Sequence, residues 1–179
     1  MPRIPYKPEN LAEPAAIVSA IRTRRGGHLH ELDRMLLHSP PFAQGWNAHL
    51  GAVRNGLTLN GRLRELAICA IAVLNGAEYE WVQHAPVFLK EGGTQAQLDA
   101  MRNFTGPGKL DAAQFNATEQ ALLQLTLEMT RDIKVTDATF AAVRAALGDD
   151  QQTAEAVGTI ATYNMVSRFL VALGVEEET

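Results

Sequence analysis

Three side chains, Glu65, Glu80 and His84, have the types and the spacing to do chemistry together. They lie within residues 62–84, RLRELAICAIAVLNGAEYEWVQH, and most of their neighbours are apolar. Glutamate and histidine are the side chains most often used to move protons near neutral pH. The stretch therefore predicts one semi-buried acid–base cluster.

Glu65 lies on a helix expected over residues 62–74, with Asn60 as its cap and Gly76 as its end. At about 100° per residue, Glu65 falls roughly opposite a core stripe but is itself flanked by apolar residues. A helix that is apolar all round is usually buried all round, which would bury Glu65. The alternative is a first-turn acid that favours the helix dipole and meets water. The pattern leaves both interpretations open.

The next helix, expected over residues 78–90, places Glu80, Gln83 and His84 on one face. Glu80 and His84 are one turn apart, so a hydrogen bond between them would orient the imidazole and raise its pKa. The alternative is a surface ion pair of little energetic weight. Because burial raises the pKa of a carboxyl and an imidazolium lowers it, the acid more remote from His84 should be the better proton donor. We therefore assign Glu65 as the acid and Glu80 as the residue that orients His84.

Three further residues are candidates for binding a substrate: Tyr79, Gln83 and Arg168. Arg168, on the last expected helix with Tyr163 and Asn164, could receive a substrate carboxylate through its bidentate fork. A structural ion pair between Arg168 and an acid such as Glu65 or Glu80 is the alternative. Glu65, Glu80 and His84 could also ligate a metal, but they match no metal motif. We expect neither a metal nor another cofactor.

Helix signals dominate the elements that must position these residues. Proline, glycine and capping residues divide the chain into helices, and no strand alternation or strand-pairing turn is found. The sequence predicts one all-α domain over residues 1–179, a bundle of about eight helices after an extended arm at residues 1–12. The longest expected loop covers residues 105–114. The helices are expected at residues 15–25, 28–37, 41–54, 62–74, 78–90, 94–103, 116–131, 137–147 and 151–173.

Composition limits the partners and the compartment. The chain has 179 residues, 46% of them hydrophobic, and a net charge of -4, which gives no reason to expect nucleic acid. No apolar run approaches the roughly 20 residues that span a bilayer, and the N-terminus lacks the apolar segment of a secretory signal. The single cysteine, Cys69, excludes an internal disulfide and a CxxC pair. We expect a cytoplasmic protein with no membrane partner, and a homo-oligomer, because the central helices carry more apolar faces than one small domain covers.

The motif RLRELAI followed by GAEYEWVQHAP resembles the carboxymuconolactone decarboxylase family, which shares its fold with alkylhydroperoxidase D. Weaker similarity extends to LHSPPFAQGWN before it and to YNMVSRFLVALGV at the end. The resemblance implies an alkylhydroperoxidase D-like all-α fold, assembled as a trimer, a hexamer or a similar homo-oligomer. A dimer is also compatible with the sequence.

The redox branch of that family carries a glutamate, then CxxC, then a histidine four residues after the second cysteine. Aligned on His84, the upstream glutamate matches Glu65, but the two cysteine positions hold Ala77 and Glu80. Tyr79 takes the place of a second histidine found in some redox members. Peroxide reduction by this motif needs one thiolate to attack and a second thiol to resolve the product, so negligible thiol peroxidase activity is expected.

The resemblance therefore implies the lyase branch of the family. In that branch, loss of carbon dioxide leaves an enolate-like anion, which a histidine and a glutamate could stabilise and protonate. We expect a cofactor-free decarboxylase or proton-transfer enzyme that acts on a small lactone or carboxylic acid. Two alternatives remain: a peroxide-handling protein of the alkylhydroperoxidase or peroxiredoxin type, and a non-catalytic helical binding or assembly module.

Overall fold

The computed structural model describes residues 1–106 and 108–178, and every regular element within them is a helix. The all-α prediction is confirmed: the described residues form nine α-helices, one in each of the nine ranges expected from the sequence, and one short 3-10 helix. The 3-10 helix lies in the segment expected to be the longest loop, of which residue 107 is outside the described residues. The elements are α1 (Ala15–Arg24), α2 (Glu31–Leu36), α3 (Pro40–Asn55), α4 (Gly61–Asn75), α5 (Glu78–Lys90), α6 (Gln95–Arg102), η1 (Ala112–Gln114), α7 (Ala117–Arg131), α8 (Asp137–Leu147) and α9 (Asp150–Leu173).

The described residues group into two compact units, and each is treated by itself. The first contains Met1–Gly56 with the chain from Leu170 onward, and the second contains Leu57–Phe169. That both units belong to one domain stays a prediction from the sequence. All the residues singled out for chemistry, from Glu65 to Arg168, lie in the second unit.

A buried carboxylate organises the first unit. Asp33 is 1% exposed, and its two oxygens accept hydrogen bonds from Arg24 Nη2 and Arg25 Nε, each at 3.0 Å. The backbone N–H of His30 also donates to Asp33, at 3.3 Å. Helix α2 therefore begins at Glu31 and not at residue 28, with His30 as its N-cap. The Asp33 carboxylate fixes this start, because it accepts a hydrogen bond from the backbone N–H of His30.

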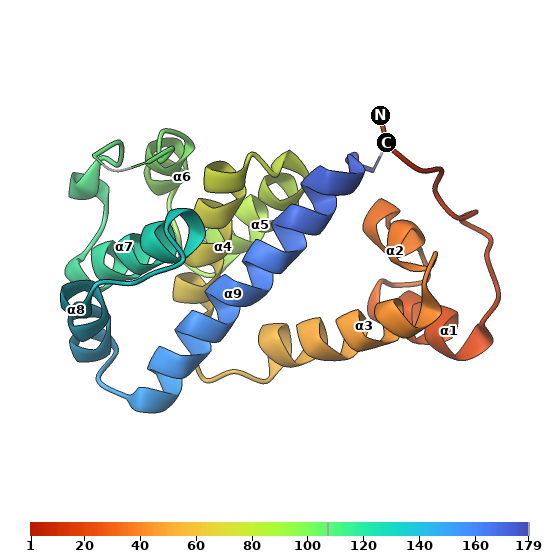
Figure 1. Ribbon diagram of the computed structural model, residues 1–179, viewed down its shortest axis with the longest axis horizontal. Helices are drawn as coiled ribbons and strands as arrows, with labels where there is room; N and C mark the ends of the chain where they lie inside the picture. Colours follow the sequence, from red (N-terminus) through yellow and green to blue (C-terminus); the bar gives the residue numbers. More distant parts are fainter. Residues whose placement is uncertain (107, 179) are drawn as a thin grey trace. The chain divides into compact units, whose positions relative to one another are not determined.

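Helix α4 is the central element of the second unit. It packs mainly against α5 and α7, and α7 packs in turn against α8 (Figure 1). Every residue from Glu65 to Ala72 is buried, so the helix is covered on all sides. This settles the alternative that the sequence left open: Glu65 is enclosed with its apolar neighbours and does not meet water.

The turn between α4 and α5 is set by Gly76. Gly76 has φ 65° in the left-handed region, which a glycine adopts without steric cost. The Ala77 N–H then donates to the Ala72 carbonyl at 2.8 Å and closes the end of α4. Because Glu78 begins α5 directly afterwards, the two helices that carry Glu65 and His84 are consecutive.

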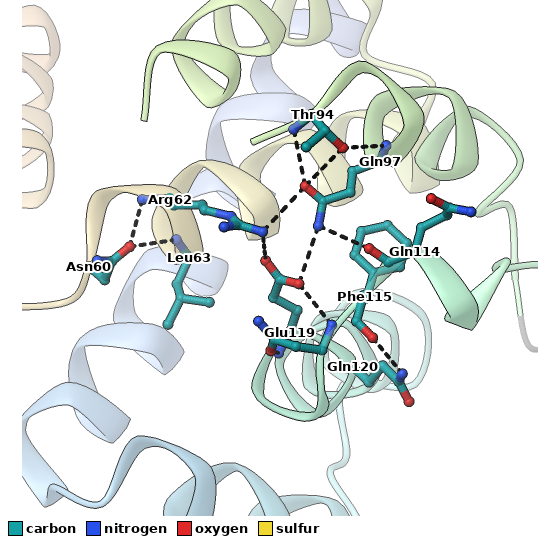
Figure 2. Close-up of polar contacts among 10 residues, drawn as sticks. Asn60, Arg62, Leu63, Thr94, Gln97, Gln114, Phe115, Glu119 and Gln120 are labelled. Atoms are coloured by element: carbon teal, nitrogen blue, oxygen red, sulfur yellow. Dashed lines mark hydrogen bonds and ion pairs between the residues drawn. The ribbon is translucent and has the colours of Figure 1, made fainter. Parts of the chain in front are cut away.

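A second buried carboxylate, Glu119, joins the N-terminal ends of α4, α6 and α7. Glu119 is 2% exposed, its Oε1 lies 2.6 Å from Arg62 Nη2, and its Oε2 accepts from Gln97 Nε2 at 3.2 Å. Figure 2 shows these three side chains meeting between the helices, with the capping residues Asn60 and Thr94 beside them. The N-cap predicted for α4, Asn60, is confirmed, and Thr94 and Asn116 cap α6 and α7.

Among the described residues, α9 is long and apolar enough to cross a membrane by length and composition alone. Half of the apolar stretch of α9 is buried within the structure. Core helices of soluble proteins can have the same length and composition. Within the second unit, Asn75 at the end of α4 donates to Asn164 Oδ1 at 3.1 Å and to Ser167 Oγ at 2.7 Å. These bonds tie α4 to α9.

Candidate active site

Glu65 and His84 form a direct pair between α4 and α5. Glu65 Oε2 lies 2.7 Å from His84 Nδ1, and only 12% of the His84 side chain is exposed. The ring of His84 also makes an edge-to-face contact with Tyr163 of α9, with 5.1 Å between ring centroids. A short charge-assisted bond and an aromatic contact together fix the orientation of the imidazole.

The pKa of Glu65 lies below its usual value. Burial by itself would raise this pKa, but the hydrogen bond and the charge of His84, followed by those of Arg64, outweigh the burial. Glu65 is therefore the ionised partner that orients His84. The sequence-based assignment of Glu65 as the proton-donating acid of raised pKa is wrong on this point, and the orienting role of Glu80 stays a prediction. The spacing of Glu80 and His84 on one helix suggested the pair, whereas the approach of α4 to α5 brings Glu65 to the imidazole.

Glu80 is enclosed in the same region. Its side chain is 1% exposed and lies on α5 one turn before His84. Glu65 and Glu80 both act electrostatically on Cys69, which lies one turn after Glu65 on α4. The structure brings Glu65 and His84 into contact, and the convergence of Glu80 with them stays a prediction.

The thiol of Cys69 is poorly suited to react. The residue is fully buried, and burial together with the charges of Glu65 and Glu80 raises the thiol pKa far above its ordinary value. Because the thiolate is the nucleophilic form of cysteine, this environment suppresses nucleophilic chemistry at Cys69.

The three predicted substrate-binding residues occupy different environments. Tyr79 is buried, Gln83 is half-buried beside His84 on α5, and Arg168 is exposed on α9. Arg168 donates from Nη1 to the backbone carbonyl and to Oδ1 of Asn164, at 3.1 and 3.0 Å. The alternative of an ion pair between Arg168 and Glu65 or Glu80 is therefore wrong, because the partner of Arg168 is a neutral residue of its own helix.

Arg64 is the polar neighbour of the pair that the sequence argument missed. Its Nε lies 3.2 Å from Glu65 Oε1, and 14% of its side chain is exposed. Glu65 therefore uses one carboxylate oxygen for Arg64 and the other for His84. Neighbouring residues on a helix point in different directions, so spacing gave no signal for this contact.

Within the part of the chain that the structure describes, no group of three or more His, Cys, Asp or Glu side chains is placed to hold a metal ion. The chemistry that this arrangement can perform is proton transfer by an imidazole that a carboxylate orients.

The comparisons with known proteins agree with the fold. The family model described as "Carboxymuconolactone decarboxylase family" matches residues 40–126, a range that includes Glu65, Glu80 and His84. No curated protein matches the sequence.

Solved structures resemble nearly the whole chain. A peroxidase-related protein from Ralstonia eutropha JMP134, described as an alkylhydroperoxidase AhpD core, has a TM-score of 0.80 at 20% identity and covers 99% of this chain and 92% of its own. A peroxidase-related protein from Silicibacter sp. TM1040 has a TM-score of 0.77 at 15% identity, with 99% and 94% covered. A protein of unknown function from Agrobacterium tumefaciens has a TM-score of 0.68 at 17% identity, with 81% and 96% covered. At these identities the similarity establishes the alkylhydroperoxidase D-like fold alone.

Proposed function

We propose that this protein is a cofactor-free decarboxylase or related proton-transfer enzyme acting on a small lactone or carboxylic acid. The match of residues 40–126 to the carboxymuconolactone decarboxylase family model supports the proposal. The observation that carries the proposal is the 2.7 Å contact between Glu65 Oε2 and His84 Nδ1. A carboxylate in this position holds an imidazole in one tautomer and stabilises its protonated form.

His84 exchanges the proton in this mechanism. With Glu65 ionised, Nδ1–H of His84 donates a hydrogen bond to Glu65 Oε2, so Nε2 is the ring atom that takes up or delivers a proton. The Glu65 charge compensates the positive charge that the imidazolium carries between the two steps.

Decarboxylation can be written with these groups alone. The bond between the departing carboxylate and its neighbouring carbon breaks, and the electron pair stays on that carbon as an enolate-like anion. The His84 imidazolium adds its Nε2 proton to the carbon, and solvent returns a proton to the ring. Glu80, buried one turn from His84 on the same helix, is the second carboxyl group of the proposed site.

The test is an assay for carbon dioxide release, and for deuterium incorporation from solvent, with a panel of small lactones, keto acids and aromatic acids. Glu65→Gln and His84→Ala should each lower any activity found by at least about a hundredfold, the usual contribution of a positioned acid or base. The matched control for Glu80→Gln is Glu78→Gln. Glu78 lies on the same helix, is exposed, and pairs with Arg102 at 2.7 Å.

Two results would count against the proposal. Activity that survives both Glu65→Gln and His84→Ala in folded protein removes the acid–base mechanism. Inactivity of the wild type towards the whole panel favours the non-catalytic binding module.

Peroxide handling remains the second candidate, because two of the similar structures are described as peroxidase-related. Ala77 and Glu80 stand where the redox branch has its two cysteines, and Cys69 is buried with a raised thiol pKa. A thiol route is therefore disfavoured in this chain.

A further inference from the structure

Arg64 is held beside the Glu65–His84 pair in an unusual way. Adjacent residues of an α-helix point about 100° apart, so side chains at positions i and i+1 do not normally meet. The contact of 3.2 Å between Arg64 Nε and Glu65 Oε1 requires the arginine to fold back along α4 towards its neighbour. The guanidinium therefore lies next to the carboxylate that orients His84.

The outer edge of this guanidinium is available. Among the described residues, Glu65 is the hydrogen-bonding partner of Arg64, and it contacts Nε only. The structure shows no hydrogen bond for the two terminal nitrogens there, and 14% of the side chain is exposed. A guanidinium with Nε engaged presents its two terminal N–H₂ groups as an end-on fork, which matches the two oxygens of a carboxylate.

The charge of Arg64 can offset that of an anion at this position. The part of the α4–α5 pair around His84 holds Glu65 and Glu80, and Arg64 is the cation that contacts Glu65. A substrate carboxylate on the far side of the guanidinium would be attracted by Arg64 and kept apart from Glu65 by it. It would also lie within one small molecule's length of the imidazole.

We propose that Arg64, and not Arg168, binds the carboxylate of the substrate, so that the enzyme acts on anionic acids in preference to neutral lactones. The identification of this substrate class depends on the proposed proton-transfer function, whereas the binding of a carboxylate by Arg64 does not. Arg64 thereby has two contacts: Nε fixes Glu65, and the terminal nitrogens select the ligand.

The experiment measures binding of benzoate and acetate to the full chain by NMR, with the ring protons of His84 as the reporter. Benzamide and acetamide, which match the probes in shape but lack the charge, are the ligand controls. The wild type should respond to the acids and not to the amides. In Arg64→Gln the dissociation constant for the acids should rise at least about tenfold, since a charged hydrogen bond is lost.

Arg144→Gln is the matched protein control. Arg144 lies on α8 and is exposed, with an ion pair of 2.6 Å to Asp150, so its loss should leave carboxylate binding unchanged. Wild-type affinity in Arg64→Gln, loss of binding in Arg168→Gln in its place, or equal binding of acids and amides would each overturn the proposal. An arginine that only supported Glu65 structurally would not change the discrimination between acid and amide.

If Arg64→Gln fails to fold, Arg64→Lys replaces it. A lysine ammonium is a single point charge and cannot pair with Glu65 and form a fork to a carboxylate at once, so the same tenfold loss is expected, and wild-type affinity would overturn the proposal. Failure of the proposed function looks different, because carboxylates would still bind through Arg64 while no substrate lost carbon dioxide or exchanged a proton.

Discussion

The carboxylate of Glu65 on α4 and the imidazole of His84 on α5 are joined by a 2.7 Å contact, although Glu80 is the acid nearer to His84 in the sequence. The ionised member of the pair is Glu65, because His84 and Arg64 together outweigh the effect of its burial. The predictions below follow from this arrangement and from the elements that support it.

Glu65→Gln should change how stability depends on pH. The pKa of Glu65 in the folded protein is below its usual value, so its ionised form is favoured by folding. Its contribution is complete above the unfolded-state pKa of about 4.3 and is lost as the pH falls through the folded-state pKa. Urea denaturation should therefore show a wild-type advantage over Glu65→Gln near pH 6 that shrinks towards pH 3. A stability difference between the wild type and Glu65→Gln that did not change with pH would contradict this. Glu91→Gln, at an exposed position, is the control.

Cys69 should resist alkylation in the folded protein. Burial, with Glu65 and Glu80 adding to its effect, raises the thiol pKa, so a thiol reagent at pH 8 should label Cys69 rapidly only after unfolding in guanidinium chloride. Peroxide consumption in the presence of a dithiol reductant should be negligible and equal in the wild type and in Cys69→Ser. Robust turnover that disappears in Cys69→Ser would overturn this view of the site.

The ion pair in Figure 2 should respond unequally to loss of its two partners. Glu119 is 2% exposed, while 33% of the Arg62 side chain is exposed. Arg62→Met leaves a buried carboxylate without its cation, whereas Glu119→Gln leaves an arginine that can reach water. We expect Arg62→Met to cost about 3 kcal/mol of unfolding free energy in urea titrations and Glu119→Gln clearly less. The opposite order would show that capping at α7, and not the charge pair, dominates the cluster.

The exposed apolar stripe on α5 should take part in self-association. Val82 and Leu89 are 38% and 39% exposed, and Pro86 is exposed between them at helical spacing. We expect light scattering to show a homo-oligomer for the wild type and a smaller species for Val82→Glu or Leu89→Glu. Phe140→Glu, at an exposed apolar position on α8, is the control and should not change the mass. A wild-type monomer at micromolar concentration would rule the interface out.

The sequence predicted those features that depend on a few neighbouring residues. The cap at Asn60 and the end of α4 at Gly76 agree with the structure, because each rests on hydrogen bonds within one turn of chain. The burial of Glu65 was one of two open interpretations, since periodicity describes the face of a helix and not what covers it.

The part that could not be predicted is the choice of partners between helices. Glu80 satisfied the spacing rule for a contact with His84, but Glu65 makes the bond from a neighbouring helix. Arg168 had the right chemistry for a carboxylate, yet Asn164 binds its guanidinium. Arg64 was overlooked because its contact with Glu65 runs against helical geometry. Each of these outcomes depends on side-chain conformation and on the distance between helices, which a one-dimensional pattern does not contain.

Glu65 and His84 are only 19 positions apart in the chain, and the left-handed turn at Gly76 lies between them. Their relative placement is thus encoded within a single helical hairpin. Outside the hairpin, Tyr163 of α9 also supports the pair through its ring contact with His84. A fold shared with proteins only 15–20% identical is compatible with such local encoding, in which the geometry of the pair depends mainly on one short segment.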